Sequence, residues 1–370
     1  MPVSLAYSDV YLVPKYSTLR SRNDADVSVE FLGKRFTSPV MPANMTSVID
    51  ASIAQWLSQA NHFYIYHRFG DTLAFVRNAN VTNQNDWPKG WNTISISIGV
   101  QERDKVLLRQ IIEEKLRVDY ITIDVAHGHH VLVRDMIAFI KSLFLVSDRT
   151  VPKIIAGNVT TPDAVRDLTT WGADAAKVGI AGGAACRTRN VTGFHIPMFS
   201  CVKQCVEEGG PLMNGSVDPY GISLVPTRAR IPIIADGGIK ETGDIVKALV
   251  AGASMVMCGS LLAACKNAPG ENIYEETSDV MCRLGSGVVI SPPYGGQRRI
   301  KAKRYYGSAS ANQKKETRHI EGTVVEIPCN GLFYDEKYQE INEGLQSAVS
   351  YAGGRDLSAF SSVQWISVNK

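Results

Sequence analysis

Short apolar runs alternate with amphipathic stretches along most of the chain. Eight of these runs have the length and composition of buried strands, and they cover residues 38–43, 63–67, 93–99, 120–126, 153–158, 175–180, 232–238 and 254–260. Between them, apolar residues recur every three or four positions, which predicts helices over residues 50–60, 105–116, 162–172 and 242–252.

This alternation predicts the fold class. Eight strand–helix units in succession indicate an α/β protein built as a (β/α)8 barrel, the TIM barrel. A doubly wound open sheet is the alternative, but no GxGxxG sequence follows the first strand. We expect a single domain over residues 1–370. Two Gly- and Pro-rich segments, at about 206–230 and 275–300, interrupt the pattern, and we expect both to be loop insertions at the C-terminal mouth of the barrel.

Charge and composition narrow the function classes. A net charge of +3 over 370 residues does not indicate nucleic-acid binding, and the basic stretch 298–304 is typical of a solvated loop. No apolar run reaches the length of about 18 residues that a membrane span requires, so we expect no membrane partner. The seven cysteines lack CxxC spacing, which favours a reduced, cytoplasmic protein. The histidines within 127–130 crowd one tight turn, an arrangement that rarely holds a metal ion.

Glycine and polar residues collect where the last two predicted strands end. The seventh strand ends in Asp236, Gly237 and Gly238, and the eighth in Gly259 and Ser260. In a (β/α)8 barrel the loops after these two strands commonly bind phosphate, because glycine lets an anion approach the backbone amides. The two pairs of glycines together favour a phosphate site over simple tight turns.

A glycine-rich loop after the sixth strand carries a single cysteine, Cys186. The residues before it are small, so a ligand has room to approach the sulfur. A buried cysteine is most often inert packing. Here Arg187, Thr188 and Arg189 follow at once, and nearby positive charge is typical of a cysteine that acts as a nucleophile.

Motifs in the same order along nearly the whole chain resemble the IMP dehydrogenase/GMP reductase family, and most of all its bacterial GMP reductases. They are "PANM" (42–45), "YIYHRF" (64–69), "YITIDVAHGH" (120–129), "IIAGNV" (154–159), "KVGI" (177–180) with Cys186 and Thr188, "PIIADGGI" (232–239), "MVMCGS" (255–260), "YGSAS" (306–310) and "SYAGG" (350–354). No regulatory (CBS) domain pair is inserted after the second strand, as it is in many dehydrogenases of the family.

The resemblance implies a reductive deamination. The sulfur of Cys186 matches the nucleophile that adds to C2 of GMP; ammonia then leaves and a thioimidate remains. Hydride from NADPH reaches C2, and the thiol departs to give IMP. Thr188 and Glu321 match the pair that handles the proton of the leaving ammonia. Sulfur suits this chemistry because it both adds and leaves readily.

The resemblance also assigns the binding residues. A purine nucleoside monophosphate would be bound by Asn158, Asp236, Gly237, Gly238, Gly259, Ser260, Tyr306, Gly307, Ser308 and Gly322, with Asp236 on the ribose. NADPH would be bound by Ser21, Arg22, Arg68, Asp124, His127, Gly128, Tyr351, Gly353 and Gly354. Ser21 and Arg22 match residues that reach the cofactor of a neighbouring subunit, so we expect a homotetramer.

The loop 179–184 departs from the family pattern. It reads GIAGGA, where the family usually has a sequence close to GIGPGS, and Ala184 stands in place of a polar phosphate ligand. We expect Arg187 to supply the phosphate charge instead. The resemblance further implies a monovalent cation, K+, at the backbone carbonyls of Ala181, Gly183 and Cys186.

Other functions remain open at this point. An IMP dehydrogenase would need an Arg–Tyr pair on its flap, and the stretch 311–320 contains none. A family member acting on a modified or deoxy purine nucleotide is a further alternative. Lys177 on the sixth strand raises the possibility of a Schiff-base aldolase, although a structural lysine is favoured there. A nucleotide-binding sensor without turnover is the non-enzyme alternative, against which Cys186, Thr188 and Glu321 argue.

Overall fold

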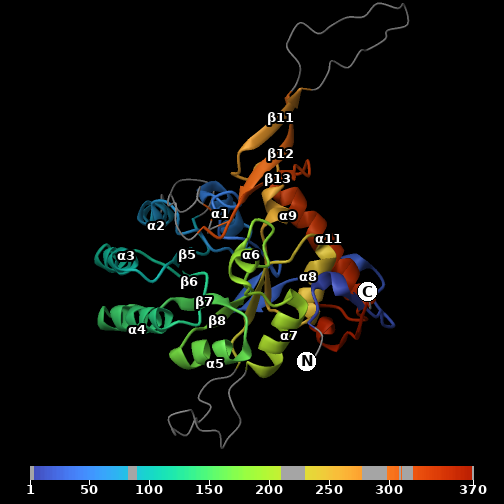
Figure 1. The fold of residues 1–370 in the computed structure, drawn as a ribbon, viewed down its shortest axis with the longest axis horizontal. Coiled ribbons are helices and arrows are strands. Elements are labelled where there is room, and N and C mark those ends of the chain that lie inside the picture. The colour runs from blue at the N-terminus through green and yellow to red at the C-terminus, as the bar shows by residue number, and fades with distance from the viewer. Residues whose placement is uncertain are drawn as a thin grey trace, which may run out of the picture.

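The computed structural model describes residues 4–81, 90–209, 230–276, 298–307, 310 and 320–368. Its centre is a curled sheet of seven parallel strands (Figure 1). In chain order these are β4 (Val40–Pro42), β5 (Ser95–Ile98), β6 (Tyr120–Asp124), β7 (Lys153–Val159), β8 (Ala175–Val178), β9 (Ile233–Asp236) and β10 (Met255–Cys258).

The strands of this sheet that come first and last in the chain, β4 and β10, are hydrogen-bonded neighbours. The strand order is β4-β10-β9-β8-β7-β6-β5, and Val256 of β10 lies opposite Val40 of β4. An open doubly wound sheet does not pair its first strand with its last in this way. This strand order confirms the predicted barrel fold, with β4 and β5 as the two edges of the curled seven-stranded sheet.

The prediction of a regular second strand at residues 63–67 is wrong. The segment forms an isolated parallel bridge from Tyr66 to Ile96, with the Ser97 amide donating to the Tyr66 carbonyl at 2.9 Å, along the free edge of β5. Side-chain packing holds this segment in place, and a regular ladder of backbone hydrogen bonds does not form. Phe63 is fully buried with its ring 5.1 Å from that of Tyr120, and the Tyr64 hydroxyl donates to the Thr93 carbonyl at 2.8 Å.

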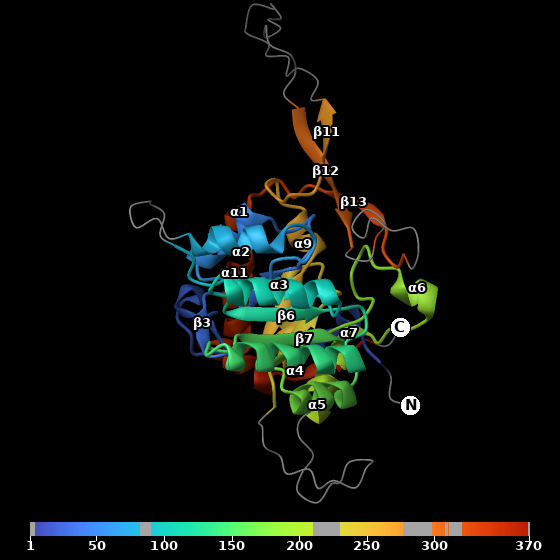
Figure 2. The same cartoon turned by 90° about the vertical axis from the view of Figure 1, so that its left-hand side faces the viewer.

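Helices cover the outside of the sheet (Figures 1 and 2). They are α1 (Ala51–Gln59), α2 (Thr72–Asn80), α3 (Glu102–Glu113), α4 (Val131–Val146), α5 (Pro162–Trp171), α7 (Met198–Glu208), α8 (Thr242–Val250) and α11 (Tyr334–Tyr351). All four helices expected from periodicity are present. Their ends follow from capping: the Thr161 hydroxyl accepts from the Ala164 amide at the start of α5, and Gly172 ends it with φ +100°.

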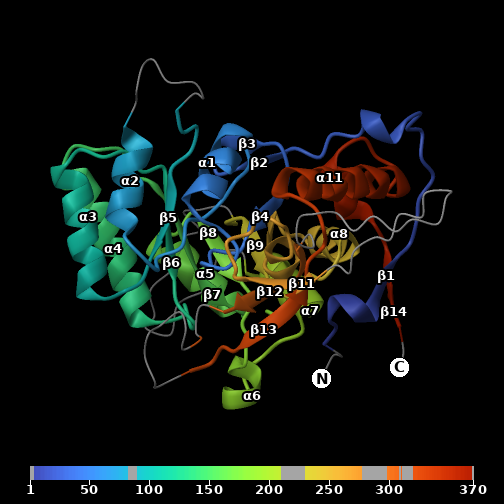
Figure 3. The ribbon, with the colours of Figure 1, turned by 90° about the horizontal axis from the view of Figure 1, so that it is seen from above.

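Smaller elements surround this barrel. Near the two ends of the described chain, β1 (Val10–Leu12) pairs with β14 (Trp365–Ser367), while β2 (Val29–Phe31) and β3 (Lys34–Phe36) form a hairpin. Helix α11 packs along α8 (Figure 3). The short helices α6 (Thr188–Thr192) and α9 (Ser260–Ala263) follow β8 and β10.

A three-stranded antiparallel sheet extends away from the barrel. Its order is β11 (Asn272–Glu276), β12 (Arg298–Tyr306) and β13 (Val324–Pro328), and Figure 2 shows it rising above the barrel helices. This sheet follows α9 at the carboxyl end of β10, so the flanks of the predicted 275–300 insertion do lie at the mouth. Residues 277–297 themselves are outside the described residues.

The placement of the other insertion, 206–230, is corrected by its flanks. Residues 206–208 belong to helix α7, and the chain is described again from Arg230, just before β9 begins. A helix-to-strand connection of a barrel lies at the amino ends of the strands, opposite the mouth. The flanks of this segment are therefore on the far side from the strand ends that carry Asp236 and Ser260; residues 210–229 are outside the described residues.

Buried histidines predict how stability depends on pH. Burial lowers the pKa of His62 to about 4 and that of His67 to about 4, from the ordinary 6.5. The folded protein holds both rings neutral, whereas the unfolded chain takes up protons near pH 6.5. Their contribution to stability is therefore complete above about pH 6.5 and is lost as the pH falls toward 4.

We expect His62→Gln to reduce the loss of unfolding free energy between pH 7 and pH 5 by about 2 kcal/mol, because one site of proton uptake is removed. Urea unfolding at several pH values measures this. The exposed His127 provides a matched control, and His127→Gln should keep the slope of the wild type. Parallel pH profiles for wild type and His62→Gln would contradict the prediction.

Candidate active site

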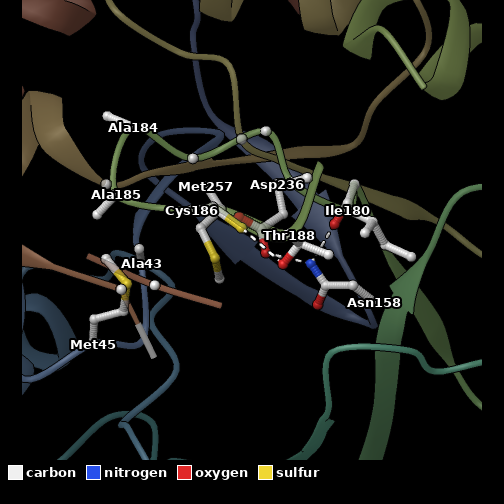
Figure 4. Close-up of a pocket in the computed structure, with 18 of the residues that line it drawn as sticks. Ala43, Met45, Asn158, Ile180, Ala184, Ala185, Cys186, Thr188, Asp236 and Met257 are labelled. Carbon is white, nitrogen blue, oxygen red and sulfur yellow. Dashed lines mark hydrogen bonds between the residues drawn. The ribbon is translucent and has the colours of Figure 1, made fainter. Parts of the chain in front are cut away.

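The carboxyl ends of the strands surround a cavity of about 720 Å³ (Figure 4). A volume of this size is in the range of sites that bind small molecules. Most of the residues that the sequence singled out line it: Arg68, Asp124, Asn158, Ala181, Gly183, Cys186, Thr188, Asp236, Gly237, Gly238, Gly259, Ser260, Gly307, Glu321 and Gly322.

Three side chains in this cavity form a hydrogen-bonded chain. The Cys186 thiol donates to the Thr188 hydroxyl at 3.2 Å, and that hydroxyl donates to Glu321 Oε2 at 2.8 Å. Glu321 comes from the segment before β13, far from Cys186 in sequence, and Figure 4 shows Cys186 beside Thr188 at the centre of the cavity. A thiol, a hydroxyl and a carboxylate in series can move a proton away from a sulfur nucleophile.

Backbone hydrogen bonds hold Glu321 in this position. The Arg187 amide donates to the Glu321 carbonyl at 2.7 Å, and the Thr323 amide donates to the Ala185 carbonyl at 2.9 Å. Cys186 and Gly322 thereby form an antiparallel bridge. The loop that carries Cys186 is thus paired with the segment that carries Glu321.

The same loop packs against the glycines after β9. The Gly238 amide donates to the Gly182 carbonyl at 2.8 Å, and Gly237 and Gly238 have φ of +113° and +79°. A Cβ on Gly182 would lie 3.1 Å from the Gly237 Cα. Ala181 also has a left-handed backbone, with φ +63°. The family usually has glycine at this position, and glycine adopts this conformation readily. The backbone of the turn is therefore kept although the residue differs.

A buried lysine joins two carboxylates at the floor of the cavity. Lys177 Nζ lies 2.9 Å from Asp124 Oδ1 and 2.7 Å from Asp236 Oδ2, and its side chain is 4% exposed. Burial alone would lower the pKa of Lys177, but the charges of the two aspartates outweigh it and raise that pKa. A Schiff base needs a neutral amine, so the structure does not support the aldolase alternative.

Asp124 is ionised for the complementary reason. Burial would raise its pKa, but the charges of Lys177 and Arg68, together with the hydrogen bond from Lys177, hold the pKa below its usual value. Asp236 also accepts a hydrogen bond from Asn158 Nδ2 at 2.8 Å. Sequence reasoning treated Lys177 as structural, although a charged residue inside the otherwise apolar strand β8 signals a buried partner.

The residues expected to bind phosphate differ in whether they reach the cavity. Gly259 and Ser260 line the cavity, but Tyr306 does not; the neighbouring Tyr305 does, with its hydroxyl against Gly259. Alternation along β12 explains the difference, because Lys303 and Tyr305 point to the buried face and Tyr306 does not. Ser308 lies outside the described residues.

The expected role of Arg187 is not supported by its position. Arg187 is exposed and absent from the cavity lining, whereas Arg189, two residues on, lines it together with Lys240. Arg187 stands at the start of the short helix α6, which directs its side chain differently from that of Arg189. The cationic side chains of the cavity are therefore Arg68, Lys177, Arg189 and Lys240.

The predicted cofactor residues fall into two groups. Arg68 and Asp124 line the cavity, with 4.0 Å between Arg68 Nε and Asp124 Oδ2. His127 and Gly128 do not line it. His127 is exposed, and Gly128 packs so closely on β7 that its amide donates to the Asn158 carbonyl at 2.7 Å and an added Cβ would lie 2.8 Å from the Gly157 carbonyl carbon.

The second group lies together but apart from the cavity lining. The Arg22 guanidinium stands 5.7 Å from the centre of the Tyr351 ring, and its Nη1 donates to the Ser347 hydroxyl at 3.3 Å. Ser21 accepts from the Asn23 amide, and Gly353 and Gly354 follow Tyr351 after the end of α11. Ser21, Arg22 and Tyr351 are exposed, so they are accessible on the surface of this chain.

The histidines of 127–130 have separate roles. His129 Nε2 lies 2.7 Å from Asp167 Oδ2, and the His130 ring accepts from the Leu132 amide at the start of α4. Within the described ranges, no group of three or more His, Cys, Asp or Glu side chains could hold a metal ion. None of the helices described is both long and apolar enough to cross a membrane.

Comparison with known proteins gives consistent matches. Residues 4–369 match the family model of the IMP dehydrogenase / GMP reductase domain. The chain is 40% identical over 366 residues to a GMP reductase of Oenococcus oeni, covering 98% of this chain and 96% of that protein. It is 40% identical over 365 residues to one of Leptothrix cholodnii (97% and 94%) and 37% identical over 364 residues to one of Staphylococcus carnosus (98% and 95%).

Variants of two adjacent glycines, Gly182 and Gly183, test how closely the loop before Cys186 packs. Gly182→Ala would push a methyl group against the Gly237 backbone, whereas a Cβ on Gly183 would meet nothing closer than 3.8 Å. We expect Gly182→Ala to lower the free energy of unfolding by about 1–3 kcal/mol and Gly183→Ala to change it by less than about 0.5 kcal/mol. Denaturant titration of both variants measures this, and equal losses would contradict it.

Proposed function

Because the chain belongs to the IMP dehydrogenase / GMP reductase family, we propose that it is a GMP reductase, which converts GMP to IMP and ammonia with NADPH as the reductant. The observation that carries this proposal is the chain of hydrogen bonds from Cys186 through Thr188 to Glu321 inside the cavity. Relatives with the printed name GMP reductase match nearly the full length of the chain, which supports it.

The first half of the reaction removes the amino group. The Cys186 sulfur forms a bond to C2 of GMP, and its proton passes through the Thr188 hydroxyl to Glu321. Glu321 returns that proton to the C2 amino group, which leaves as ammonia when its C–N bond breaks. The product is a thioimidate of the purine on Cys186, and the atoms balance because the thiol proton departs with the ammonia.

The second half releases IMP. NADPH, when bound, supplies the hydride that reduces C2. The C–S bond then breaks, and the Cys186 sulfur regains a proton that Glu321 takes up from solvent and passes back through the Thr188 hydroxyl.

The residues of the cavity fit a nicotinamide cofactor. Arg68 Nε is buried and has no hydrogen-bond partner among the described residues, and Asp124 lies beside it. A free donor next to an ionised acceptor suits the amide and hydroxyl groups of such a cofactor. Arg68 and Asp124 would bind and orient it on the side of the cavity away from the glycines of β9 and β10.

The nucleotide itself would lie between those glycines and the nucleophile. The amides of Gly237 and Gly259 and the hydroxyls of Ser260 and Tyr305 would hold its phosphate, while the Gly238 amide stays on the Gly182 carbonyl. Burial raises the pKa of Tyr305, so its phenol remains a donor at neutral pH. Asp236 would accept from the ribose hydroxyls. The positive charges of Lys240 and Arg189, which line the same cavity, would attract the anionic ligands.

A homotetramer is part of the proposal. Ser21, Arg22 and Tyr351 are exposed and lie outside the cavity lining, so residues with a cofactor role at these positions would act on the site of a neighbouring subunit. Light scattering tests the assembly, and a fully active monomer would exclude it. A single family model across residues 4–369 supports the one-domain organisation, and free thiols at all described cysteines support a reducing, cytoplasmic location.

A potassium ion would be held by backbone carbonyls of the nucleophile loop. The carbonyl of Gly183 already accepts the Cys186 amide at 3.1 Å, and a carbonyl oxygen has a second lone pair for a cation. The left-handed turn at Ala181 preserves the backbone path of this loop. Comparing turnover in potassium with turnover in a bulky quaternary ammonium salt tests the ion; equal rates would exclude it.

The function is tested by following NADPH oxidation and ammonia release with GMP as substrate. We expect activity in the wild type and none in Cys186→Ala, together with a purine-nucleotide adduct on the Cys186 peptide in rapidly quenched wild-type samples. Cys329 is half-buried and outside the cavity lining, so Cys329→Ala is the control and should keep its activity. Turnover in Cys186→Ala would contradict the proposal, and NAD reduction with IMP as the only reaction would show a dehydrogenase.

Removing the carboxylate from the relay should slow ammonia release. We expect Glu321→Gln to lower kcat by roughly 10²–10⁴-fold, the usual contribution of a positioned acid–base group. Glu326 lies on β13 five residues further on and outside the cavity, so Glu326→Gln controls for loss of charge in this segment. Stopped-flow measurement of the rate of ammonia release compares Glu321→Gln with Glu326→Gln. Equal rates for both variants would show that Glu321 is not part of the relay.

A further inference from the structure

Lys177 is the only charged residue of strand β8, and it is buried where the barrel strands end. Its neighbours on the strand, Ala176 and Val178, are fully buried. Its amine lies within 3 Å of one oxygen of Asp124 and one oxygen of Asp236, at 2.9 and 2.7 Å. No step of the proposed reaction uses this amine.

The two aspartates come from different strands and face different parts of the cavity. Asp124 ends β6 and stands beside Arg68, whereas Asp236 ends β9 and is held by Asn158. Under the proposed function, the first serves the cofactor and the second the ribose of the nucleotide. Lys177 is therefore the residue that connects the two binding regions directly.

Two ionised carboxylates cannot lie this close in a buried site without a compensating charge. When a cation is absent, one of such a pair keeps a proton at neutral pH. A protonated carboxyl loses part of its ability to accept hydrogen bonds from ligand hydroxyls. Arg68 compensates only Asp124, and only at 4.0 Å, so it does not replace Lys177.

The other titratable groups near Asp124 and Asp236 do not balance the negative charge of the two carboxylates either. Tyr305, Tyr7 and Cys258 all feel the charge of Asp236, and burial raises the pKa of each well above neutrality. These groups are neutral at physiological pH. Among the described residues, Lys177 and Arg68 are the cations within 4.0 Å of the two carboxylates; Arg189 and Lys240 also line the cavity but form no ion pair with either carboxylate.

We propose that Lys177 is a positioning residue: its ammonium group keeps Asp124 and Asp236 both ionised, so that the cofactor side and the nucleotide side of the cavity present full acceptors at the same pH. The inference rests on the proposed function for the roles of the two aspartates. It differs from a packing role, because it predicts an effect that depends on pH.

The first test uses no ligand and compares the unfolding of wild type and Lys177→Met by urea from pH 4.5 to pH 8. In the variant the folded pair shares a proton with a raised pKa, while unfolded carboxyls release theirs near pH 4. The folded variant then binds more protons than its unfolded chain, so its stability falls as the pH rises through this window. The ratio of the unfolding constants of variant and wild type should grow by up to about tenfold per pH unit.

A loss of stability that is the same at every pH would overturn the proposal, because lost packing does not titrate. Lys177→Arg keeps the charge, so its difference from wild type should not vary with pH. Adding Asp124→Asn to Lys177→Met removes the like charge and should flatten the pH dependence. If Lys177→Met does not fold, this double variant must restore folding; its failure to do so would also overturn the proposal.

The second test measures kcat and KM for GMP over the same pH range. In Lys177→Met, kcat/KM should rise by up to about tenfold per pH unit through neutrality, because the proton shared by the two carboxyls leaves. The pH profiles of kcat/KM for wild type and Lys177→Arg should not show this rise. A profile identical to that of the wild type would overturn the role. Absence of GMP reduction in the wild type would instead reject the proposed function and leave the unfolding result to decide the charge effect.

Discussion

Pairing of the first barrel strand with the last is the interaction on which the rest of this structure depends. Residues of β4 and β10 are far apart in the sequence, yet Val40 lies opposite Val256 and Pro42 opposite Cys258. This pairing curls the sheet until the carboxyl ends of β6, β8 and β9 face one another. Side chains from separate segments, such as Asp124 and Asp236, can then share one lysine.

The position of Cys186 depends on a second pairing, between two irregular segments. Cys186 and Gly322 form a bridge, and the amide of Thr323 binds the carbonyl of Ala185. These backbone contacts fix the distance from Thr188 to Glu321 without requiring any side chain to be large. They also explain the small residues of the loop, because Gly182 lies against Gly237 with no room for a side chain. The chain of hydrogen bonds from Cys186 to Glu321 is a consequence of backbone geometry as much as of residue type.

Charge in the buried floor of the cavity is balanced locally. A lysine and two aspartates with little contact to water are tolerable only as a hydrogen-bonded group, because each alone would carry a large desolvation cost. Asn158 completes the set by donating to Asp236 and to the Gly179 carbonyl, at 2.8 and 2.6 Å. The same network that stabilises these charges therefore holds the loop after β8 in register with β9.

The sequence by itself determined the barrel and most of the cavity residues. Periodicity is a local property, so it located the strand and helix units, and the ends of the strands then predicted that Asp124, Cys186, Asp236 and Ser260 would meet. It also indicated a strand at 63–67, where packing of Phe63 and Tyr64 leaves only a bridge. The glycine-rich loop pointed to Cys186 because small residues around a thiol are visible in the sequence.

Only the tertiary structure decided which neighbours face the cavity. Tyr305 and Tyr306 are equivalent in the sequence, and so are Arg187 and Arg189; the register of β12 and the start of α6 select Tyr305 and Arg189. Lys177 is one residue of an apolar strand until β6 and β9 bring their carboxylates to it. Local patterns record what each segment prefers, whereas these choices depend on which segments the curled sheet places opposite one another.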